Sequence, residues 1–378
     1  MQQLLAHTSV VQQPAAVKPR TIEIGFRFSK DFDGINPPRL VNTVVGTLEG
    51  RLNKRPKGTI EVELLSSTSQ SQEIKEIIGK RFIVGPEAIR KNGKPLFLCG
   101  ADAKVQFGLP VVLALLGSND PFQIIPQLLL SLPDAGGAKE FFGEIVEDHE
   151  RLIELVTGKH TFKWNGYIIT RQVEAVQCFY EGEGMRDWGI WHGLVPEESG
   201  LLIVDLGGKT ANLVPLDADG EVIAEYHDSF SHGGTLDLAN RIVKDEDFKA
   251  RFGSGVKHAE VMDAIAKASR FATEQGEEID PILGTGYNAK SFQDVFLRCR
   301  EQWIDGILGE LDSRFRDKWN LFGRALFGGG SAHLLTSRLE GQDYFVVVPT
   351  PETAHLKGLT LRFAPQLAQK WVEGSSNG

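Results

Sequence analysis

The stretch LLIVDLGGKTANL, residues 201–213, decides the fold of this chain. Its apolar run predicts a buried strand that ends at Asp205, and a short polar turn then leads back into a second apolar strand. Gly207 and Gly208 allow positive φ angles and a close approach of the backbone to an anion such as phosphate. Thr210 adds a hydroxyl donor, and Asp205 can hold Mg²⁺ through water. A plain β-hairpin is the alternative for this stretch taken alone.

Two other motifs, a P-loop and the oxyanion-hole segment of an esterase, match this chain only in part. Gly208-Lys209-Thr210 resembles the end of a P-loop, but the first glycine of that motif would fall on Ile203, in the middle of the strand. His232-Gly233-Gly234 resembles the oxyanion-hole segment of an esterase, but the one G-x-S-x-G match, Gly374–Gly378, follows a predicted helix and not the strand that a nucleophile elbow needs. Neither a P-loop enzyme nor an esterase is therefore expected.

Composition narrows the class of protein further. With 378 residues, of which 41% are hydrophobic, the chain is long enough for two domains with their own cores. A net charge of −9 argues against direct binding to nucleic acid or to membranes through overall charge. Cys99, Cys178 and Cys299 are widely spaced, which indicates neither a disulfide framework nor a metal site and fits the cytoplasm. The apolar run around Leu109–Leu116 is too short to span a bilayer, and residues 1–20 lack the features of a signal peptide.

Strand-like and helix-like patterns alternate along the chain, which predicts an α/β fold. Residues 1–20 show no clear period and are expected to form a flexible arm. Asn165-Gly166 between two β-prone segments predicts a tight hairpin, and residues 221–226 are expected to form a third strand after the first-quoted hairpin. Helical periodicity covers residues 235–251, 258–275 and 291–319, and a last helix is expected near 358–375.

An internal echo of the hairpin lies near the N-terminus. Thr21–Lys30 has the same layout as Leu202–Thr210, namely a strand, an acidic residue, a glycine-containing turn and a basic or hydroxyl end. One such turn in each half of the chain suggests two domains that close on one nucleotide.

A run of glycines marks a third candidate site segment. Gly328, Gly329, Gly330 and Ser331 follow a short apolar strand and precede a helix, about 120 residues after the phosphate hairpin. Glycines there let a flat ring approach the backbone, and a helix N-terminus favours an anion. A simple turn with Ser331 as the helix N-cap is the alternative.

In this order the three segments resemble those of the superfamily of actin, sugar kinases and seventy-kilodalton heat-shock chaperones, and within it ParM-like, plasmid-segregating bacterial actins. The segments are Ile22–Lys30, Leu202–Leu213 and Ala325–Ser331, and residues 351–358 add a looser likeness. The resemblance implies two similar α/β, ribonuclease-H-like domains around a nucleotide cleft. Domain I would span residues 21–190, with the helix 358–375 packing back onto it, and domain II would span residues 191–357.

The resemblance also assigns site residues. Asp205 would hold the hydration shell of Mg²⁺, with Glu23 as a second metal-site carboxylate. The phosphates of ATP or GTP would be wrapped by two loops, Gly25, Ser29 and Lys30 in the first and Gly207, Gly208, Lys209 and Thr210 in the second. Gly328 to Ser331 would line the adenosine site. Glu181 would orient the attacking water, and Glu183 competes for that role.

Four residues depart from the family pattern. Glu23 stands where aspartate is usual, Arg27 where a small residue is common, Lys209 where a small or hydroxyl residue is expected, and Asn212 where aspartate is frequent. These departures bear on nucleotide choice and hydrolysis rate more than on the fold.

The function that the resemblance implies is a nucleoside triphosphatase that polymerises into filaments and segregates plasmid or other DNA. Because the chain is acidic, a small DNA-binding adaptor protein would contact the DNA. One alternative is a small-molecule kinase of the same superfamily, with Asp134 or Asp187 as the catalytic aspartate. Another is a nucleotide-binding regulator that does not hydrolyse its ligand.

Overall fold

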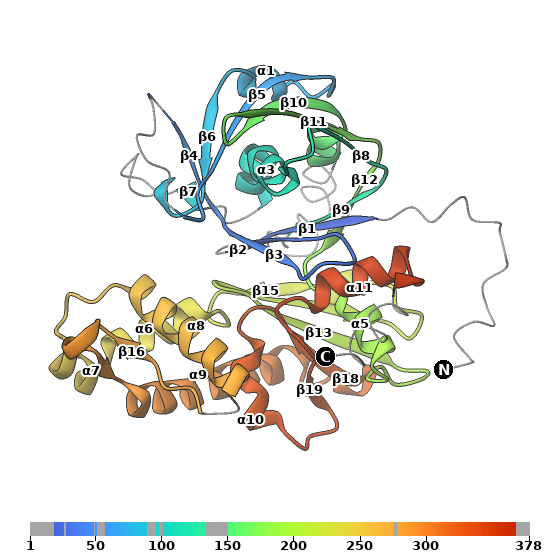
Figure 1. Cartoon of the computed structure of the whole chain (residues 1–378). Helices are drawn as coiled ribbons and strands as arrows, with labels where there is room; N and C mark the ends of the chain where they lie inside the picture. The colour runs from blue at the N-terminus through green and yellow to red at the C-terminus, as the bar shows by residue number, and fades with distance from the viewer. Residues whose placement is uncertain are drawn as a thin grey trace.

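The computed structural model describes residues 19–25, 28–48, 50, 57–88, 96–97, 101–132, 150–275 and 278–367. The expected N-terminal arm therefore lies almost wholly outside the described residues. The described chain forms two lobes that face one another, with the N-terminal half above and the C-terminal half below in Figure 1. We call them the first lobe and the second lobe.

The quoted hairpin lies at the centre of the sheet in the second lobe. Strands β13 and β14 pair antiparallel with Asp205 directly opposite Asn212, and β15 continues this meander. Strand β18 then pairs in parallel with β13, and β19 pairs in parallel with β18. The sheet order is β15-β14-β13-β18-β19, with bounds β13 Gly200–Leu206, β14 Ala211–Leu216, β15 Asp228–Phe230, β18 Phe322–Gly328 and β19 Phe345–Val347.

A sheet of the same plan lies in the first lobe. Strands β1, β2 and β3 form an antiparallel meander, and β9 and β12 extend it in parallel beside β1. The order is β12-β9-β1-β2-β3, with bounds β1 Arg20–Ile24, β2 Phe28–Phe32, β3 Arg39–Asn42, β9 Leu128–Leu132 and β12 Val176–Tyr180. The sequence echo thus corresponds to a repeated sheet topology, and the predicted fold class is confirmed.

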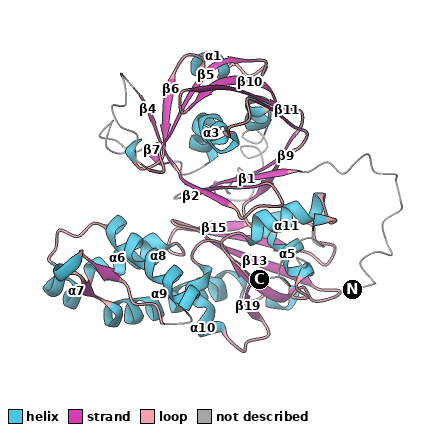
Figure 2. Cartoon of the chain, viewed as in Figure 1, coloured by secondary structure: helices cyan, strands magenta, loops and turns pink. Residues whose placement is uncertain are grey.

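Helices cover the second lobe on the left of Figure 1, whereas Figure 2 shows that strands dominate the first lobe. Trp303 and Phe296 are fully buried in the core that these helices form with the sheet. The bounds are α6 Thr235–Lys244, α7 Glu246–Phe252, α8 His258–Gln275, α9 Gln293–Phe315 and α10 Thr336–Leu339, with the small hairpin β16 Ile282–Leu283 and β17 Lys290–Ser291. The third strand begins later than predicted, because a 3₁₀ turn at Ala224–Tyr226 carries the chain to the far end of β14 before pairing resumes.

Helix α3 (Ala101–Leu116) lies between the five-stranded sheet of the first lobe and a seven-stranded sheet that curves around its other side (Figure 1). The apolar run Leu109–Leu116 forms the C-terminal half of this helix and is buried. Asn165 and Gly166 have φ angles of 54° and 91° in the turn between β10 and β11, as the Asn-Gly signal predicted. The bounds are β4 Val44–Thr47, β5 Ile60–Ser67, β6 Arg81–Val84, β7 Leu96–Phe97, β8 Phe122–Ile125, β10 Gly158–Trp164 and β11 Tyr167–Val173, with α1 at Ile74–Ile77.

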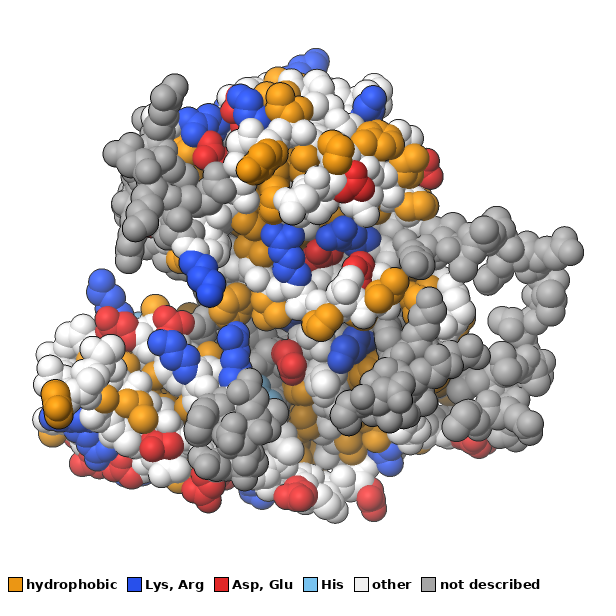
Figure 3. All heavy atoms as spheres, in the orientation of Figure 1, with side chains coloured by type: hydrophobic (Ala, Val, Ile, Leu, Met, Phe, Trp, Pro, Cys, Tyr) orange, Lys and Arg blue, Asp and Glu red, His pale blue; other side chains and the backbone are white. Residues whose placement is uncertain are grey.

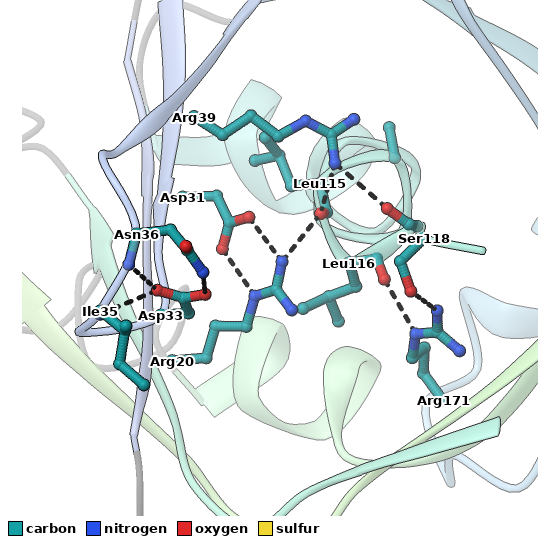
Figure 4. A network of polar contacts seen from close by, with 12 residues as sticks. Arg20, Asp31, Asp33, Ile35, Asn36, Arg39, Leu115, Leu116, Ser118 and Arg171 are labelled. Carbon is teal, nitrogen blue, oxygen red and sulfur yellow. Dashed lines mark hydrogen bonds and ion pairs between the residues drawn. The ribbon is translucent and has the colours of Figure 1, made fainter. Parts of the chain in front are cut away.

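Three arginines satisfy the carbonyl groups at the C-terminal end of α3 (Figure 4). Arg20 and Arg39 each donate to the Leu115 carbonyl at 3.2 Å, and Arg171 donates to the Leu116 carbonyl at 2.8 Å. The last carbonyls of a helix lack partners within the helix and carry partial negative charge, so cationic donors stabilise them. This arrangement allows an apolar helix to end inside the sheet.

Two helices connect the lobes. Helix α5 (Met185–Trp191) follows β12, and helix α11 (Ala354–Phe363) returns from the second lobe to β1, where Thr360 and Thr21 share a hydrogen bond of 2.9 Å. The helices touch at Gly184 and Gly358, because a Cβ at Gly358 would lie 1.6 Å from the Gly184 carbonyl oxygen. Helix α11 begins earlier than the predicted segment 358–375 and ends at Phe363, and residues 368–378 lie outside the described residues. No described helix is long and apolar enough to cross a membrane.

Candidate functional site

The turn between β13 and β14 is a four-residue loop, residues 207–210, fixed by the register that pairs Leu206 with Ala211. The Gly207 N–H donates to the Thr210 carbonyl at 2.9 Å, which closes the turn. Gly207, Gly208 and Thr210 are half-buried and Lys209 is exposed. Gly234 packs so closely under the loop that a Cβ there would lie 2.5 Å from the Lys209 backbone. The loop is therefore held from below while its outer side stays accessible.

The glycine run lies directly beside Asp205. Gly329 has a φ of 86°, and a Cβ at that position would lie 2.1 Å from Asp205 Oδ1, so only glycine fits. Gly328 is equally restricted, because its Cβ would meet the Met185 sulfur at 2.0 Å. A Cβ at Gly330 would meet open space. Gly328 and Gly329 thus leave room for the side chains of Met185 and Asp205, and Gly330 faces open space.

Ser331 joins the glycine run to the β13–β14 loop. Its N–H donates to the Leu206 carbonyl at 2.9 Å, and its hydroxyl donates to the Gly207 carbonyl at 2.8 Å. Thr235 Oγ1 lies 2.7 Å from the same hydroxyl. Ser331 is therefore buried and serves to fix the loop, rather than presenting its hydroxyl outward.

The turn between β1 and β2 has the same length as the first. Its register pairs Glu23 with Lys30 and Ile24 with Ser29, which leaves the four residues 25–28 as the loop. Gly25 allows the tight turn, because a Cβ there would lie 2.5 Å from the Phe28 carbonyl oxygen. Phe26 and Arg27 lie outside the described residues, so the predicted contribution of Arg27 has no structural counterpart here.

Lys30 brings a buried cation to the candidate site. Its ammonium donates to both carboxylate oxygens of Glu23, at 2.8 and 3.0 Å, and its side chain is only 8% exposed. Burial opposes the charge, but the carboxylates of Glu23, Asp205 and Glu181 outweigh it and raise the pKa of Lys30. Lys30, which belongs to the first lobe, therefore stays charged because carboxylates of both lobes lie near it.

Ser29 lies on the opposite face of β2 from Lys30. Its hydroxyl shares a hydrogen bond of 2.8 Å with Thr43 Oγ1, and the residue is fully buried. Successive residues of a strand point to opposite faces, so Lys30 and Ser29 cannot both face the site. The structure brings Lys30 to the site and directs Ser29 into the first lobe.

The two acidic residues of the turn after β12 point in different directions. Asn212 Nδ2 donates to Glu181 Oε2 at 3.0 Å, which places Glu181 beside the β13–β14 hairpin. Glu183 instead forms an ion pair with Arg362, which also binds Asp187 at 2.7 Å. Gly182, with a φ of 90°, reverses the chain between them. The arrangement favours Glu181 over Glu183 as the residue that faces the site.

Asn212 is a site residue that the sequence reasoning treated only as a departure from a pattern. It lies directly opposite Asp205 and is 3% exposed. Its Oδ1 is buried and has no hydrogen-bond partner among the described residues. The signal was present in the sequence, since a four-residue turn places residue 212 opposite residue 205.

The site therefore combines residues from both lobes. Asp205, Asn212 and the two glycine segments come from the second lobe, Glu23 and Lys30 from the first, and Glu181 from the turn that precedes α5. Figure 3 shows a hollow between the lobes on the viewed face, with Lys and Arg side chains on both sides of it. Carboxylates, an ammonium and glycine backbone are the groups that bind Mg²⁺ and phosphate in proteins.

No family model and no curated protein sequence matches the chain. Solved structures do match. The actin-like protein Alp7A superposes with a TM-score of 0.68 at 17% identity, covering 95% of this chain and 99% of that one. A ParM filament from Clostridium botulinum gives 0.64 at 18% identity, with 93% and 99% coverage. Bacillus thuringiensis ParM with ATP gives 0.65 at 13% identity, with 93% and 98% coverage.

Proposed function

We propose that this chain, whose fold is that of the actin-like proteins, is a nucleoside triphosphatase that assembles into filaments. The observation that carries the proposal is that Lys30 and Asp205, on two hairpins of equal loop length from the two lobes, lie near one another and near Glu181 of the turn after β12. A nucleotide bound there would contact both lobes at once, so its presence would favour their closure.

The loops would bind the nucleotide through backbone and charge. Gly207 to Thr210 would direct N–H groups at the phosphates, and Lys30 would neutralise part of their charge. Gly25 would bring the first loop close to the same phosphates. Gly329 and Gly330 would allow the nucleoside to approach the backbone, while Gly328 and Ser331 hold that segment in place.

Asp205 fits the role of the magnesium-site carboxylate. Its Oδ1 lies under Gly329, at the end of β13 where the phosphates would lie, and the chain supplies no side chain at residue 329 to displace a hydrated ion. A bound Mg²⁺ would offset the negative charge of the phosphates. Glu23 is less suited to this shell, because Lys30 holds both of its carboxylate oxygens.

Glu181 and Asn212 would position the attacking water. Glu181 would accept a hydrogen bond from the water, and its own orientation is fixed by the donation from Asn212 Nδ2. The buried Asn212 Oδ1 can accept the second proton of the same water. Phosphoryl transfer depends mainly on such positioning and on electrostatic stabilisation.

The structures of similar fold include a ParM filament and a ParM with ATP, which support self-association and nucleotide use for this chain. We extend the proposal to plasmid or DNA segregation in the cytoplasm, with a separate DNA-binding adaptor protein. The net charge of −9 is the reason for placing DNA contact on the adaptor.

The kinase alternative is less well supported by the described residues. Its candidate Asp187 accepts two hydrogen bonds from Arg362, at 2.9 and 2.7 Å, and so helps to hold α5 against α11. Asp134 lies outside the described residues.

The test compares Asp205→Ala with the unaltered chain in Mg²⁺-dependent nucleotide binding and phosphate release. We expect the variant to lose magnesium-dependent binding of ATP and GTP. Glu183→Gln is the matched control, since Glu183 faces Arg362 and its variant should bind normally. Unchanged magnesium dependence in Asp205→Ala would overturn the site assignment.

A further inference from the structure

His355 is a fully buried histidine at the junction of the lobes that the proposed chemistry leaves unused. It lies in the first turn of α11, and the Gly184 N–H donates to its Nδ1 at 3.0 Å. Gly184 follows Glu181 by three residues, so this bond ties α11 to the turn that carries the proposed water-positioning carboxylate. Because Nδ1 accepts a hydrogen bond, the ring proton must be on Nε2.

The Nε2–H group has no hydrogen-bond partner among the described residues although it is buried. Burial lowers the pKa of His355 to about 4, so the ring is neutral at pH 7 and Nε2 is a neutral donor. A buried donor without an acceptor is destabilising by about 1–3 kcal/mol. Such a group in a native structure needs a physical explanation.

The carboxylate whose charge acts on the His355 ring is that of Glu23. Thr360 on α11 touches Thr21 on β1 at 2.9 Å, which fixes where the helix crosses the strand. Glu23 lies two residues farther on the same face of β1, and His355 five residues earlier on α11, displacements of about 7 Å in each element. The charges of Glu23 and Lys30 both act on the His355 ring.

In the described structure Glu23 is fully engaged, because Lys30 holds both of its oxygens. The proposed function requires the Lys30 ammonium to turn toward the phosphates. That movement would leave a carboxylate with a side chain only 14% exposed and without its cation, which is strongly unfavourable.

We propose that His355 is a positioning residue: when Lys30 moves to a bound nucleotide phosphate, the His355 Nε2–H donates a hydrogen bond to the Glu23 carboxylate in place of Lys30. The inference rests on the proposed nucleotide binding. It links nucleotide occupancy at the first hairpin to α11, and through Gly184 to the Glu181 turn. His355 itself touches neither the nucleotide nor the water.

Two substitutions separate the two ring nitrogens. His355→Asn retains an acceptor near Nδ1 for the Gly184 N–H but removes the Nε2 donor. His355→Gln retains a donor near Nε2 and removes the acceptor. We measure the affinity of each protein for Mg-AMPPNP and Mg-GMPPNP by calorimetry, and the thermal stability of each without nucleotide.

The expected pattern is crossed. His355→Asn should weaken nucleotide affinity about tenfold to a hundredfold, the range for a hydrogen bond to a charged group, with little loss of stability in the free protein. His355→Gln should keep most of the affinity and lose stability in the free protein. A purely structural role, exerted through the Gly184 bond alone, predicts that His355→Asn keeps both affinity and stability and that His355→Gln loses both.

A second arm uses Glu23→Gln. A neutral residue at position 23 has no need of a replacement partner, so His355→Asn should cause less than a threefold further loss of affinity in that background. An undiminished loss there would overturn the inference. If Glu23→Gln fails to fold, ¹⁵N NMR of the His355 ring in the unaltered chain decides the matter, since a nucleotide-independent Nε2–H signal contradicts the exchange.

The outcomes separate the two proposals. An unaltered chain that binds neither nucleotide refutes the proposed function and the exchange with it. An unaltered chain that binds nucleotide with the same affinity as His355→Asn refutes the exchange alone.

Discussion

Replacement of Glu181 by glutamine is the perturbation that most sharply tests the chemistry of the site. The amide is nearly isosteric and can still accept the hydrogen bond that Asn212 Nδ2 donates over 3.0 Å, so the turn should keep its conformation. The variant removes one negative charge and weakens the acceptor that would orient the water. Positioned acid or base groups typically contribute about 10²- to 10⁴-fold to rate.

We therefore expect phosphate release by Glu181→Gln to fall about 100-fold or more, equivalent to about 2.7 kcal/mol in the activation barrier. Nucleotide affinity should not fall, because the lost carboxylate repels phosphate. Filaments should still form and should persist longer. The assay is single-turnover phosphate release with saturating Mg-ATP or Mg-GTP.

The control is Glu183→Gln, whose parent carboxylate pairs with Arg362 on the other side of the turn. It should release phosphate at the normal rate while losing some stability at the α5–α11 contact. A Glu181→Gln rate within twofold of the unaltered chain, or an equal loss in both variants, would refute the assignment.

Three further predictions concern residues that position the site. Arg171→Met should lower the free energy of unfolding by about 3–5 kcal/mol in urea titration, because it strips buried donors from the end of α3, whereas Arg251→Met, at an exposed pair with Asp294, should change it by less than about 1 kcal/mol. Gly329→Ala should abolish nucleotide binding and destabilise the fold by at least about 1–3 kcal/mol, since its φ is 86° and its Cβ would strike Asp205, while Gly330→Ala should fold with normal thermal stability. Burial lowers the pKa of His355 from 6.5 to about 4, so folding favours the neutral ring and stability is lost as the pH falls from 6.5 to 4. Relative to His355→Asn, the unaltered chain should lose about 3 kcal/mol of unfolding free energy over this range. Parallel pH profiles of the two proteins in chemical denaturation would contradict this.

The strand–turn–strand at 201–213 was predictable because its glycines and apolar runs act locally. The echo at 21–30 was sufficient to indicate a second hairpin, and the repeated sheet topology confirms that reading. The order of the three segments was sufficient to predict two similar lobes.

Other features depend on contacts that no local pattern carries. Strand register decides that Lys30 faces the site and that Ser29 faces Thr43. The family resemblance could not separate them and assigned both residues to the first phosphate loop. Glu181 and Glu183 are indistinguishable in sequence, and only Asn212 on one side and Arg362 on the other separate them. The carbonyl groups at the end of α3 are bound by arginines from β1, β3 and β11, which lie far apart in the chain.

Ser331 shows a further limit. A serine after three glycines before a helix reads equally well as a ligand contact or as a helix cap. The structure uses its hydroxyl to hold the Gly207 carbonyl, a contact between residues 124 positions apart.

The most direct measurement is right-angle light scattering of the purified chain with Mg²⁺ and ATP or GTP, followed by negative-stain microscopy of the same samples. The proposed function predicts scattering that rises on addition of a triphosphate and decays as phosphate is released, with filaments visible at the maximum. A flat trace from a chain that calorimetry shows to bind nucleotide would contradict filament assembly and favour a kinase or a regulator.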